Sequence, residues 1–281
     1  MVKRFSMWSS VLLGLALLGI GFSAAAADEV TYKGSTTVLP VAQMLSEALA
    51  PNIVFSVQGG GSGTGIAAII DGTTDIAGSS RYMKLEEFQK AVANGVMPYV
   101  WEVAIDTLAI VVHPSNPIEQ ITYEDLRRIY FGEVTNWSVL GGPDMPIVVV
   151  SRDTSSGTYG TFKEVVLENQ EVTDGALFQS SNGAVATTVA STPGAIGYVG
   201  LGYLQPSLKA IPLAKTAEGP FVAASVETAL SLEYPFSRPL FMITNGYPQG
   251  AVARVIRFAL SDEGQRLVLE AGYAPIRALS E

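Results

Sequence analysis

The sequence has no cysteine and only one histidine, His113, among its 281 residues. Without cysteine the protein can form no disulfide, no thiolate nucleophile, no iron–sulfur cluster and no cysteine-rich zinc site. A single histidine cannot supply a metal site built from histidines alone. We therefore expect no metal, no cofactor and no catalytic residue.

Charged residues are also scarce, at 15% of the sequence, and 26 acidic side chains against 17 basic ones give a formal charge of −9. Proteins that bind nucleic acid carry a clustered basic surface, so this composition argues against a nucleic-acid partner. Hydrophobic residues make up 48% of the chain, which is enough for a large core. The length fits one large domain or two modest ones.

The N-terminus has the three-part layout of a secretory signal peptide. Lys3 and Arg4 precede the apolar run Val11–Ile20, and four alanines stand directly before Asp28. We predict a signal peptide over residues 1–27 and a protein released into the periplasm, because no cysteine is present to carry a lipid anchor. The alternative is an uncleaved membrane anchor, since the apolar segment is almost long enough to span a bilayer. Cleavage would leave a formal charge of −11.

Beyond residue 28, short β-rich runs alternate with segments of helical periodicity, which predicts an α/β fold with mostly parallel sheets. In such sheets ligands bind at the carboxyl ends of the strands, where helix N-termini gather. The predicted strands cover residues 30–33, 52–58, 75–77, 105–112 and 147–150. The predicted helices cover residues 38–49, 66–70, 84–94, 123–130 and 158–167.

Three loops share one composition: Gly34–Thr37, Gly59–Gly65 and Ser151–Thr158. Each is rich in glycine and hydroxyl side chains, and each precedes or opens a predicted helix. Glycine lets backbone approach a ligand, and the free N–H groups and dipole of a helix start favour an anion. Arg81 and Arg152 add guanidinium groups suited to a tetrahedral oxyanion. One such loop alone fits an ordinary turn and N-cap, but the three together favour anion binding.

Nucleotide and hydrolase patterns fit these loops poorly. The best dinucleotide-like match, at residues 63–68, lacks the acidic residue expected about 20 positions further on, and no P-loop is present. Ser62 lacks the second glycine of a nucleophile elbow, because Thr64 occupies that position. His113 lies in a proline-rich strand exit and is expected to be exposed or packed rather than catalytic.

Several runs together resemble the periplasmic phosphate-binding proteins of phosphate ABC transporters, the PstS-like family. The resemblance extends over nearly the whole chain after the predicted signal peptide. The runs are GSTTVLP (34–40), QGGGSGTG (58–65), DIAGSSR (75–81), YFGEVTNW (130–137), RDTSSGT (152–158), SNGA (181–184), GAIGYVG (194–200) and YPFSRPL (234–240).

The resemblance implies a type II periplasmic-binding-protein fold, with two α/β lobes around a ligand cleft. Two crossing strands, near residues 110–112 and 234–237, would join the lobes. Lobe I would then be discontinuous, at residues 28–109 and 236–281, and lobe II would cover 110–235. The implied function is to capture inorganic phosphate and deliver it to the membrane permease subunits of an ABC transporter. Such a receptor is not an enzyme, and we expect a monomer.

The resemblance also implies a set of phosphate-binding residues, from the three loops and from the strand end at Ser80. The set is Ser35, Thr36, Thr37, Ser62, Ser80, Arg81, Arg152, Ser156, Gly157 and Thr158. In the best-understood members a carboxylate at the position of Ser80 accepts the phosphate proton, so a serine there weakens the discrimination against sulfate. Asp153 would supply the missing carboxylate if its side chain turned inward; the alternative, which we expect, is that it orients Arg152 through a salt bridge.

Two alternatives follow from the same residues. The first is a binding protein for another tetrahedral oxyanion, such as sulfate or tungstate. The second is a secreted phosphate-handling enzyme or a sensor that uses the same cleft. A phosphatase would need a nucleophile beside a base, or a metal cluster, and neither is visible in the sequence.

Overall fold

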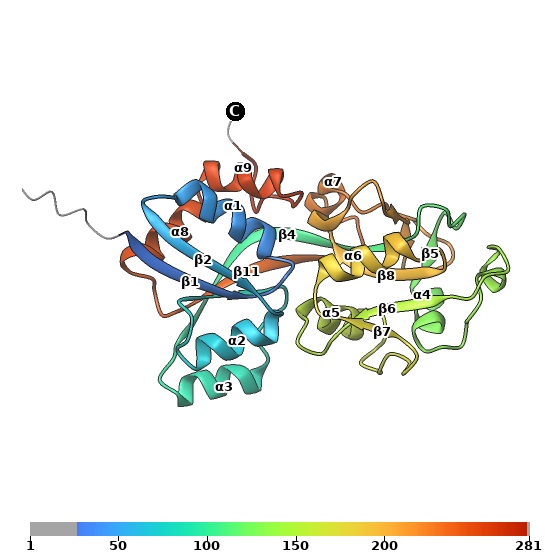
Figure 1. Cartoon of the computed structure of the whole chain (residues 1–281), viewed down its shortest axis with the longest axis horizontal. Helices are drawn as coiled ribbons and strands as arrows, with labels where there is room; N and C mark the ends of the chain where they lie inside the picture. Colours follow the sequence, from blue (N-terminus) through green and yellow to red (C-terminus); the bar gives the residue numbers. More distant parts are fainter. Residues whose placement is uncertain (1–26, 280–281) are drawn as a thin grey trace, which may run out of the picture.

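The computed structural model describes residues 27–279, so residues 1–26 of the predicted signal peptide lie outside the described residues. A nine-stranded sheet runs through the molecule in the order β2-β1-β3-β11-β4-β8-β6-β7, with β9 paired to β4. The elements form two groups that lie side by side along the longest axis (Figure 1). Between residues 27 and 279, no helix has the length and hydropathy of a membrane span.

The first group begins with three βα units. Strand β1 pairs in parallel with both β2 and β3, as the alternation of strands and helices predicts. Its strands and helices are β1 (Asp28–Gly34), α1 (Leu39–Leu49), β2 (Ile53–Gly59), α2 (Ser62–Ile70), β3 (Ile76–Ser79) and α3 (Leu85–Ala93). Helix α2 starts at Ser62, four residues before the predicted start, because Gly61, at a φ of 98°, completes the turn. Two C-terminal helices, α8 (Gly250–Ala259) and α9 (Asp262–Glu270), complete this group.

Two long strands connect the first group to the second. Strand β4 (Pro98–Val112) pairs antiparallel with β11 (Ser237–Asn245) up to Thr107. From Leu108 onward β4 pairs with β8 instead. The predicted strand covers only the last part of β4, from residue 105, because the earlier residues pair with a segment far away in the sequence. The sheet is therefore parallel within each group and antiparallel at its centre.

The second group contains the remaining elements. Strand β6 pairs in parallel with β7 and β8, and β5 pairs with β10 in a separate two-stranded sheet. Its strands are β5 (Ile121–Thr122), β6 (Val148–Arg152), β7 (Leu177–Gln179), β8 (Ala195–Gly200), β9 (Lys209–Ala210) and β10 (Leu213–Ala214). Its helices are α4 (Tyr123–Tyr130), α5 (Gly157–Val165), α6 (Asn182–Ser191) and α7 (Val226–Leu230), with 3-10 turns η1 (Trp137–Leu140) and η2 (Leu201–Tyr203).

Helices cover both faces of the sheet, and the strands supply side chains to both. Leu108, Ile110 and Val112 of β4 belong to one hydrophobic cluster, whereas Ala109 and Val111 belong to another. Strand β11 alternates in the same way between the two clusters of the first group. Successive side chains of a strand point to opposite faces, so a strand that is buried on both faces contributes alternate residues to two different clusters. The core thus fixes which strand ends, and which loops, meet between the two groups.

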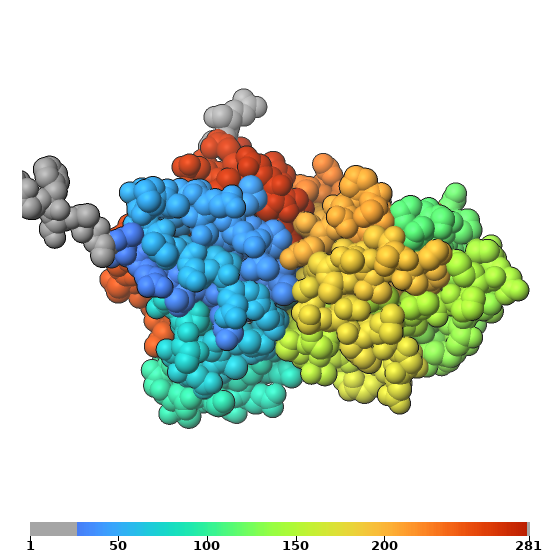
Figure 2. Space-filling model, in the orientation of Figure 1, coloured from blue at the N-terminus to red at the C-terminus, as the bar shows by residue number. Residues whose placement is uncertain are grey.

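The two groups are in contact rather than separated. In the space-filling view the blue N-terminal part touches the yellow and orange part along the visible face (Figure 2). Backbone also joins them, because Gly63 N–H donates to the Ser155 carbonyl at 2.9 Å. The Ser155 hydroxyl donates back to the Gly60 carbonyl at 3.2 Å. The glycine loop before α2 and the loop before α5 are therefore held together.

Candidate functional site

All the residues predicted to bind phosphate are buried except Arg81. Seven of the buried residues carry hydroxyl groups: Ser35, Thr36, Thr37, Ser62, Ser80, Ser156 and Thr158. Burying a hydroxyl without a partner is costly, so such a cluster is stable only where the groups bond to one another, to backbone or to a ligand. The contacts between the two groups of elements show how this requirement is met.

The turn after β1 places Thr36 and Thr37 between the groups. Ser35 N–H donates to the Gly78 carbonyl at 2.9 Å, and the Ser35 hydroxyl accepts from Thr37 N–H at 3.1 Å. A β-carbon on Gly34, whose φ is +147°, would lie 2.2 Å from the Gly78 carbonyl oxygen. Only glycine therefore allows β1 and β3 to approach this closely, and the turn holds both threonines at the end of the strand.

Ser62 and Ser80 form a second pair of hydroxyl groups. Ser80 N–H donates to Ser62 Oγ at 3.0 Å, and the two Oγ atoms are 3.3 Å apart. The first residue of α5 packs against both serines, because a β-carbon on Gly157 would lie 2.2 Å from Ser62 Oγ and 2.7 Å from Ser80 Oγ. The N-terminus of α5, in the second group, is thus in direct contact with serines of the first group.

The predicted set lacks Asn182, a buried residue that binds two of its threonines. Its side-chain amide donates to Thr36 Oγ1 at 3.1 Å and to Thr37 Oγ1 at 3.0 Å, and its Oδ1 accepts from Gly200 N–H at 3.1 Å. Thr37 Oγ1 is also 2.9 Å from Thr158 Oγ1. Asn182 lies in the SNGA run, whose Ser181 is the N-cap of α6. The sequence signal that could have identified this residue was an asparagine directly after a serine N-cap. Through Asn182, the N-terminus of α6 also lies beside Thr36 and Thr37.

Arg152 is fully buried at the end of β6. Its Nε donates to the Gln179 carbonyl and its Nη2 to the Ser180 carbonyl, both at 3.0 Å. Burial lowers the pKa of Arg152 from its ordinary value, whereas the negative charge of Asp153 raises it. The expected salt bridge does not hold the guanidinium, because the Asp153 carboxylate accepts from Ser155 N–H at 2.8 Å and from the Ser155 hydroxyl. Backbone carbonyls orient Arg152 instead.

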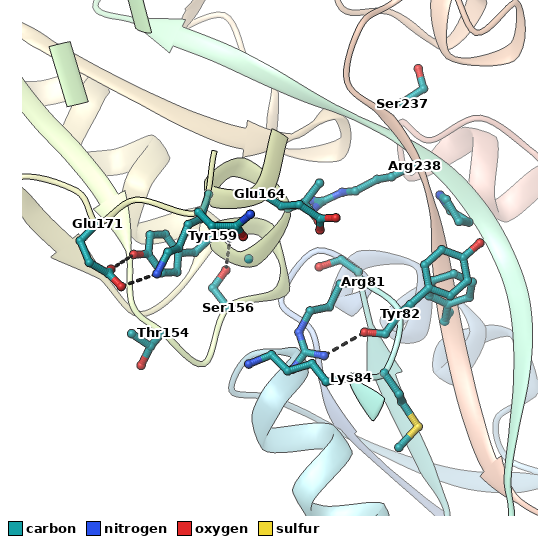
Figure 3. Close-up of a pocket in the computed structure, with 18 residues that line it drawn as sticks. Arg81, Tyr82, Lys84, Thr154, Ser156, Tyr159, Glu164, Glu171, Ser237 and Arg238 are labelled. Atoms are coloured by element: carbon teal, nitrogen blue, oxygen red, sulfur yellow. Dashed lines mark hydrogen bonds and ion pairs between the residues drawn. The ribbon is translucent and has the colours of Figure 1, made fainter. Parts of the chain in front are cut away.

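Arg81 lies outside the buried cluster. Its Nη1 and Nη2 bind Glu87 at 2.8 and 2.7 Å, and Nη1 also donates to the Tyr82 carbonyl. It lines a cavity of about 730 Å³ between the two groups, together with Ser80 and Ser156 (Figure 3). Its guanidinium is already paired with a carboxylate, and it belongs to the rim of the site. Its contact with the anion stays a prediction, because pairing with a carboxylate does not stop a guanidinium from donating to a further oxyanion.

The structure also brings an ion pair to the cluster. Arg238 Nη2 donates to Asp106 Oδ2 and to Thr158 Oγ1, both at 2.9 Å. Asp106 is completely buried, and burial raises its pKa while the charge of Arg238 lowers it. Arg238 lies in the YPFSRPL run, but nothing in the sequence indicated that it would pair with Asp106, since the two residues meet only through the pairing of β4 with β11.

The described residues show no arrangement for metal chemistry or for histidine catalysis. In the part of the chain from 27 to 279, no three His, Cys, Asp or Glu residues are grouped so that they could hold a metal ion. His113 Nδ1 is 2.8 Å from the Ser115 hydroxyl in the loop after β4. Its ring is therefore packed into a local turn. What the site offers is hydrogen-bond donors and positive charge.

Comparisons with known proteins agree with this chemistry. The sequence matches the PBP superfamily domain over residues 22–263. It is 32% identical to the phosphate-binding protein PstS of Pseudomonas aeruginosa, over 87% of this chain and 82% of that protein. It is 31% identical to PstS of Bacillus subtilis, over 89% and 82%.

Two solved structures are similar along most of the chain. One is a substrate-binding protein assigned to a phosphate ABC transporter of Clostridium perfringens, and its structure was determined with bound phosphate. It has a TM-score of 0.80 and is 32% identical in sequence, and the match covers 89% of this chain and 100% of that chain. The other is an ABC-type phosphate transport receptor from Vibrio cholerae, with a TM-score of 0.68, 31% identity, and 87% and 99% coverage. This α/β chain belongs to the PBP superfamily and, within it, to the PstS-like phosphate-binding proteins.

Proposed function

We propose that this protein captures inorganic phosphate and delivers it to an ABC transporter. One observation carries the proposal: hydroxyl groups at or beside the starts of α1, α2 and α5 and the Asn182 amide at the start of α6 are buried, and so is the guanidinium of Arg152. Helix starts supply N–H donors and a favourable dipole, and a guanidinium matches two oxygens of a tetrahedral anion. The proposed binding residues are Ser35, Thr36, Thr37, Ser62, Ser80, Arg81, Arg152, Ser156, Gly157 and Thr158, with Asn182 added from the structure.

Local donors must provide the binding energy, because the whole chain is acidic, at a formal charge of −9. Each charge-assisted hydrogen bond contributes about 1.5–3 kcal/mol, and the sum must offset the anion's desolvation and the cost of association. A surplus of about 8 kcal/mol corresponds to a micromolar dissociation constant. Binding of this kind involves no covalent step, so the protein acts as a receptor and not as an enzyme.

We further propose two lobes that close over the ligand, joined by β4 and β11 as crossing strands. Support comes from the hydrophobic clusters. On β4, Ala104 packs in a cluster of the first group and Leu108 in a cluster of the second. At the other connection, Phe236 packs in the second group and Leu240 of β11 in the first. Each lobe thus has a core of its own and can move as a unit. On this basis lobe I comprises residues 28–107 and 237–281, and lobe II comprises residues 108–236. These boundaries differ slightly from the predicted ones (28–109 with 236–281, and 110–235), because Leu108, Ala109 and Phe236 pack in the clusters of lobe II.

The partners of such a receptor are the permease subunits of the transporter, in the membrane. The predicted signal peptide and the family support a periplasmic location, and we propose a monomer that meets the permease after closing on phosphate. Secretion can be tested by sequencing the N-terminus of the exported protein, which should begin near Asp28. An N-terminus at Met1 or Val2 would contradict cleavage.

The choice of anion is tested by competition. Isothermal titration calorimetry at pH 7 should show tight binding of phosphate, and a large excess of sulfate should weaken it little. A specific observation keeps sulfate as the second candidate: Ser80, which offers a hydroxyl rather than a carboxylate, is hydrogen-bonded to Ser62. Equal affinity for the two anions would identify a general oxyanion receptor. No binding of phosphate at all would refute the proposed function.

A further inference from the structure

Arg238 is a buried arginine outside the set that the family resemblance supplies. It is the second residue of β11 and lies opposite Asp106 of β4 in the antiparallel register. Its Nε and Nη2 both donate to Asp106 Oδ2, at 3.1 and 2.9 Å, and Asp106 Oδ1 accepts from Leu201 N–H at 2.8 Å. One edge of the guanidinium is therefore held by a carboxylate that is itself held by backbone.

The remainder of this guanidinium faces the hydroxyl cluster. Nη2 also donates to Thr158 Oγ1 at 2.9 Å. Nη1 is buried and has no hydrogen-bond partner among the described residues. A buried donor on a charged group is costly to leave without a hydrogen-bond partner, so the position of Nη1 beside Thr158 needs an explanation. Figure 3 shows the side chain of Arg238 extending from β11 toward α5, along the wall of the cavity between the groups.

The charges around Arg238 Nη1 also favour an anion. Burial lowers the pKa of Arg152, and the positive charge of Arg238 contributes in the same direction, so the two guanidinium groups lie close enough to repel. The Asp106 carboxylate offsets part of this repulsion at Arg238, and the charge of Asp153 offsets part of it at Arg152. An oxyanion bound near both arginines would offset the rest and would accept a hydrogen bond from the unpaired Nη1.

We propose that Arg238 is a second anion-binding arginine, which donates Nη1 to the bound oxyanion, and that Asp106 is the positioning residue that directs it. This inference rests on the proposed phosphate-binding function. The geometry requires arginine, because only a planar fork can bind the carboxylate with one edge and the ligand with the other end. Since Arg238 belongs to β11, the ligand would contact a connecting strand as well as the two lobes.

The test is calorimetric titration of inorganic phosphate into the wild type and two variants. Arg238→Lys keeps the charge and loses the fork. The double variant Asp106→Asn/Arg238→Gln removes both charges, so that neither is left buried without its partner. We expect both to lose at least tenfold in affinity while their melting curves stay cooperative. Arg254→Gln is the control, because Arg254 of α8 is an arginine paired with Asp28 that does not line the cavity, and this variant should bind within threefold of the wild type.

The outcomes separate this inference from the function on which it depends. A folded double variant that binds phosphate within threefold of the wild type would overturn the inference and leave the function intact. If the double variant does not fold, Arg238→Lys decides: wild-type affinity there would assign Arg238 a structural role only. Failure of the wild type to bind phosphate would count against the function itself.

Discussion

Gly157 stands so close to Ser62 that a β-carbon on the glycine would lie 2.2 Å from the serine Oγ. The two residues are far apart in the sequence and begin helices α5 and α2, in different groups of elements. Their contact shows that the two helix N-termini meet with almost no space to spare. The first prediction tests whether phosphate binding requires this contact.

Gly157→Ala should weaken phosphate binding by tenfold or more, because the new methyl group would force α5 away from Ser62 and Ser80. Calorimetry measures the loss. Gly160→Ala on the same helix is the matched control, since its β-carbon would meet only the flexible Arg81 side chain, with Cδ at 3.4 Å and Nε at 3.9 Å, which are ordinary contacts. That variant should bind normally and be as stable as the wild type or more stable, because alanine favours a helix over glycine by about 1 kcal/mol. Equal affinity in both variants would show that the close contact is dispensable.

Arg152→Ala should reduce phosphate affinity at least tenfold without unfolding the protein. The reason is loss of a buried guanidinium whose Nε and Nη2 are oriented by the Gln179 and Ser180 carbonyls. Arg152→Lys should also lose affinity, because an ammonium group cannot reproduce the fork. Unchanged affinity in the alanine variant would remove Arg152 from the site.

Asn182→Ala should lower both stability and affinity. The substitution removes the bonds to Thr36 and Thr37 and leaves Gly200 N–H without its partner. A cost of about 1–3 kcal/mol in the free energy of unfolding is expected for a buried group left unpaired. Denaturant unfolding and calorimetry measure the two effects, and Thr188→Ala on the same helix should change neither. A loss of stability with full affinity would limit Asn182 to a structural role.

Glu87→Gln should destabilise the protein at neutral pH but not in acid. Burial raises the pKa of Glu87, but hydrogen bonds from Arg81 and from Lys84 N–H outweigh it and hold the pKa below its ordinary value. The folded state then binds fewer protons than the unfolded state, so the contribution to stability exists above the ordinary pKa and is lost as the pH falls through the lowered value. For a partly exposed pair we expect a decrease of roughly 1–3 °C in Tm at pH 7 that disappears near pH 3. Thermal melts across this range check it, and a constant difference at every pH would contradict it.

Much of the fold could be predicted from local pattern. The βα units around Gly34–Thr37, Gly59–Gly65 and Ser151–Thr158 follow from periodicity and from turn residues, which act over a few positions in the chain. The first half of β4 could not be predicted in this way. It is a strand because it pairs with β11, and the paired residues, from Thr107↔Ser237 to Pro98↔Asn245, are far apart in the sequence.

The same division applies to the site. The sequence by itself determined that glycine-rich, hydroxyl-bearing loops precede or open several helices, and this composition already indicated an anion. Only the tertiary structure decided which charged side chains join them: Arg152 is buried and oriented by carbonyls, Arg81 is paired with Glu87, and Arg238 arrives opposite Asp106. The physical reason is that a loop's conformation depends on its own residues, whereas the direction of a long side chain depends on partners that strand register brings within reach.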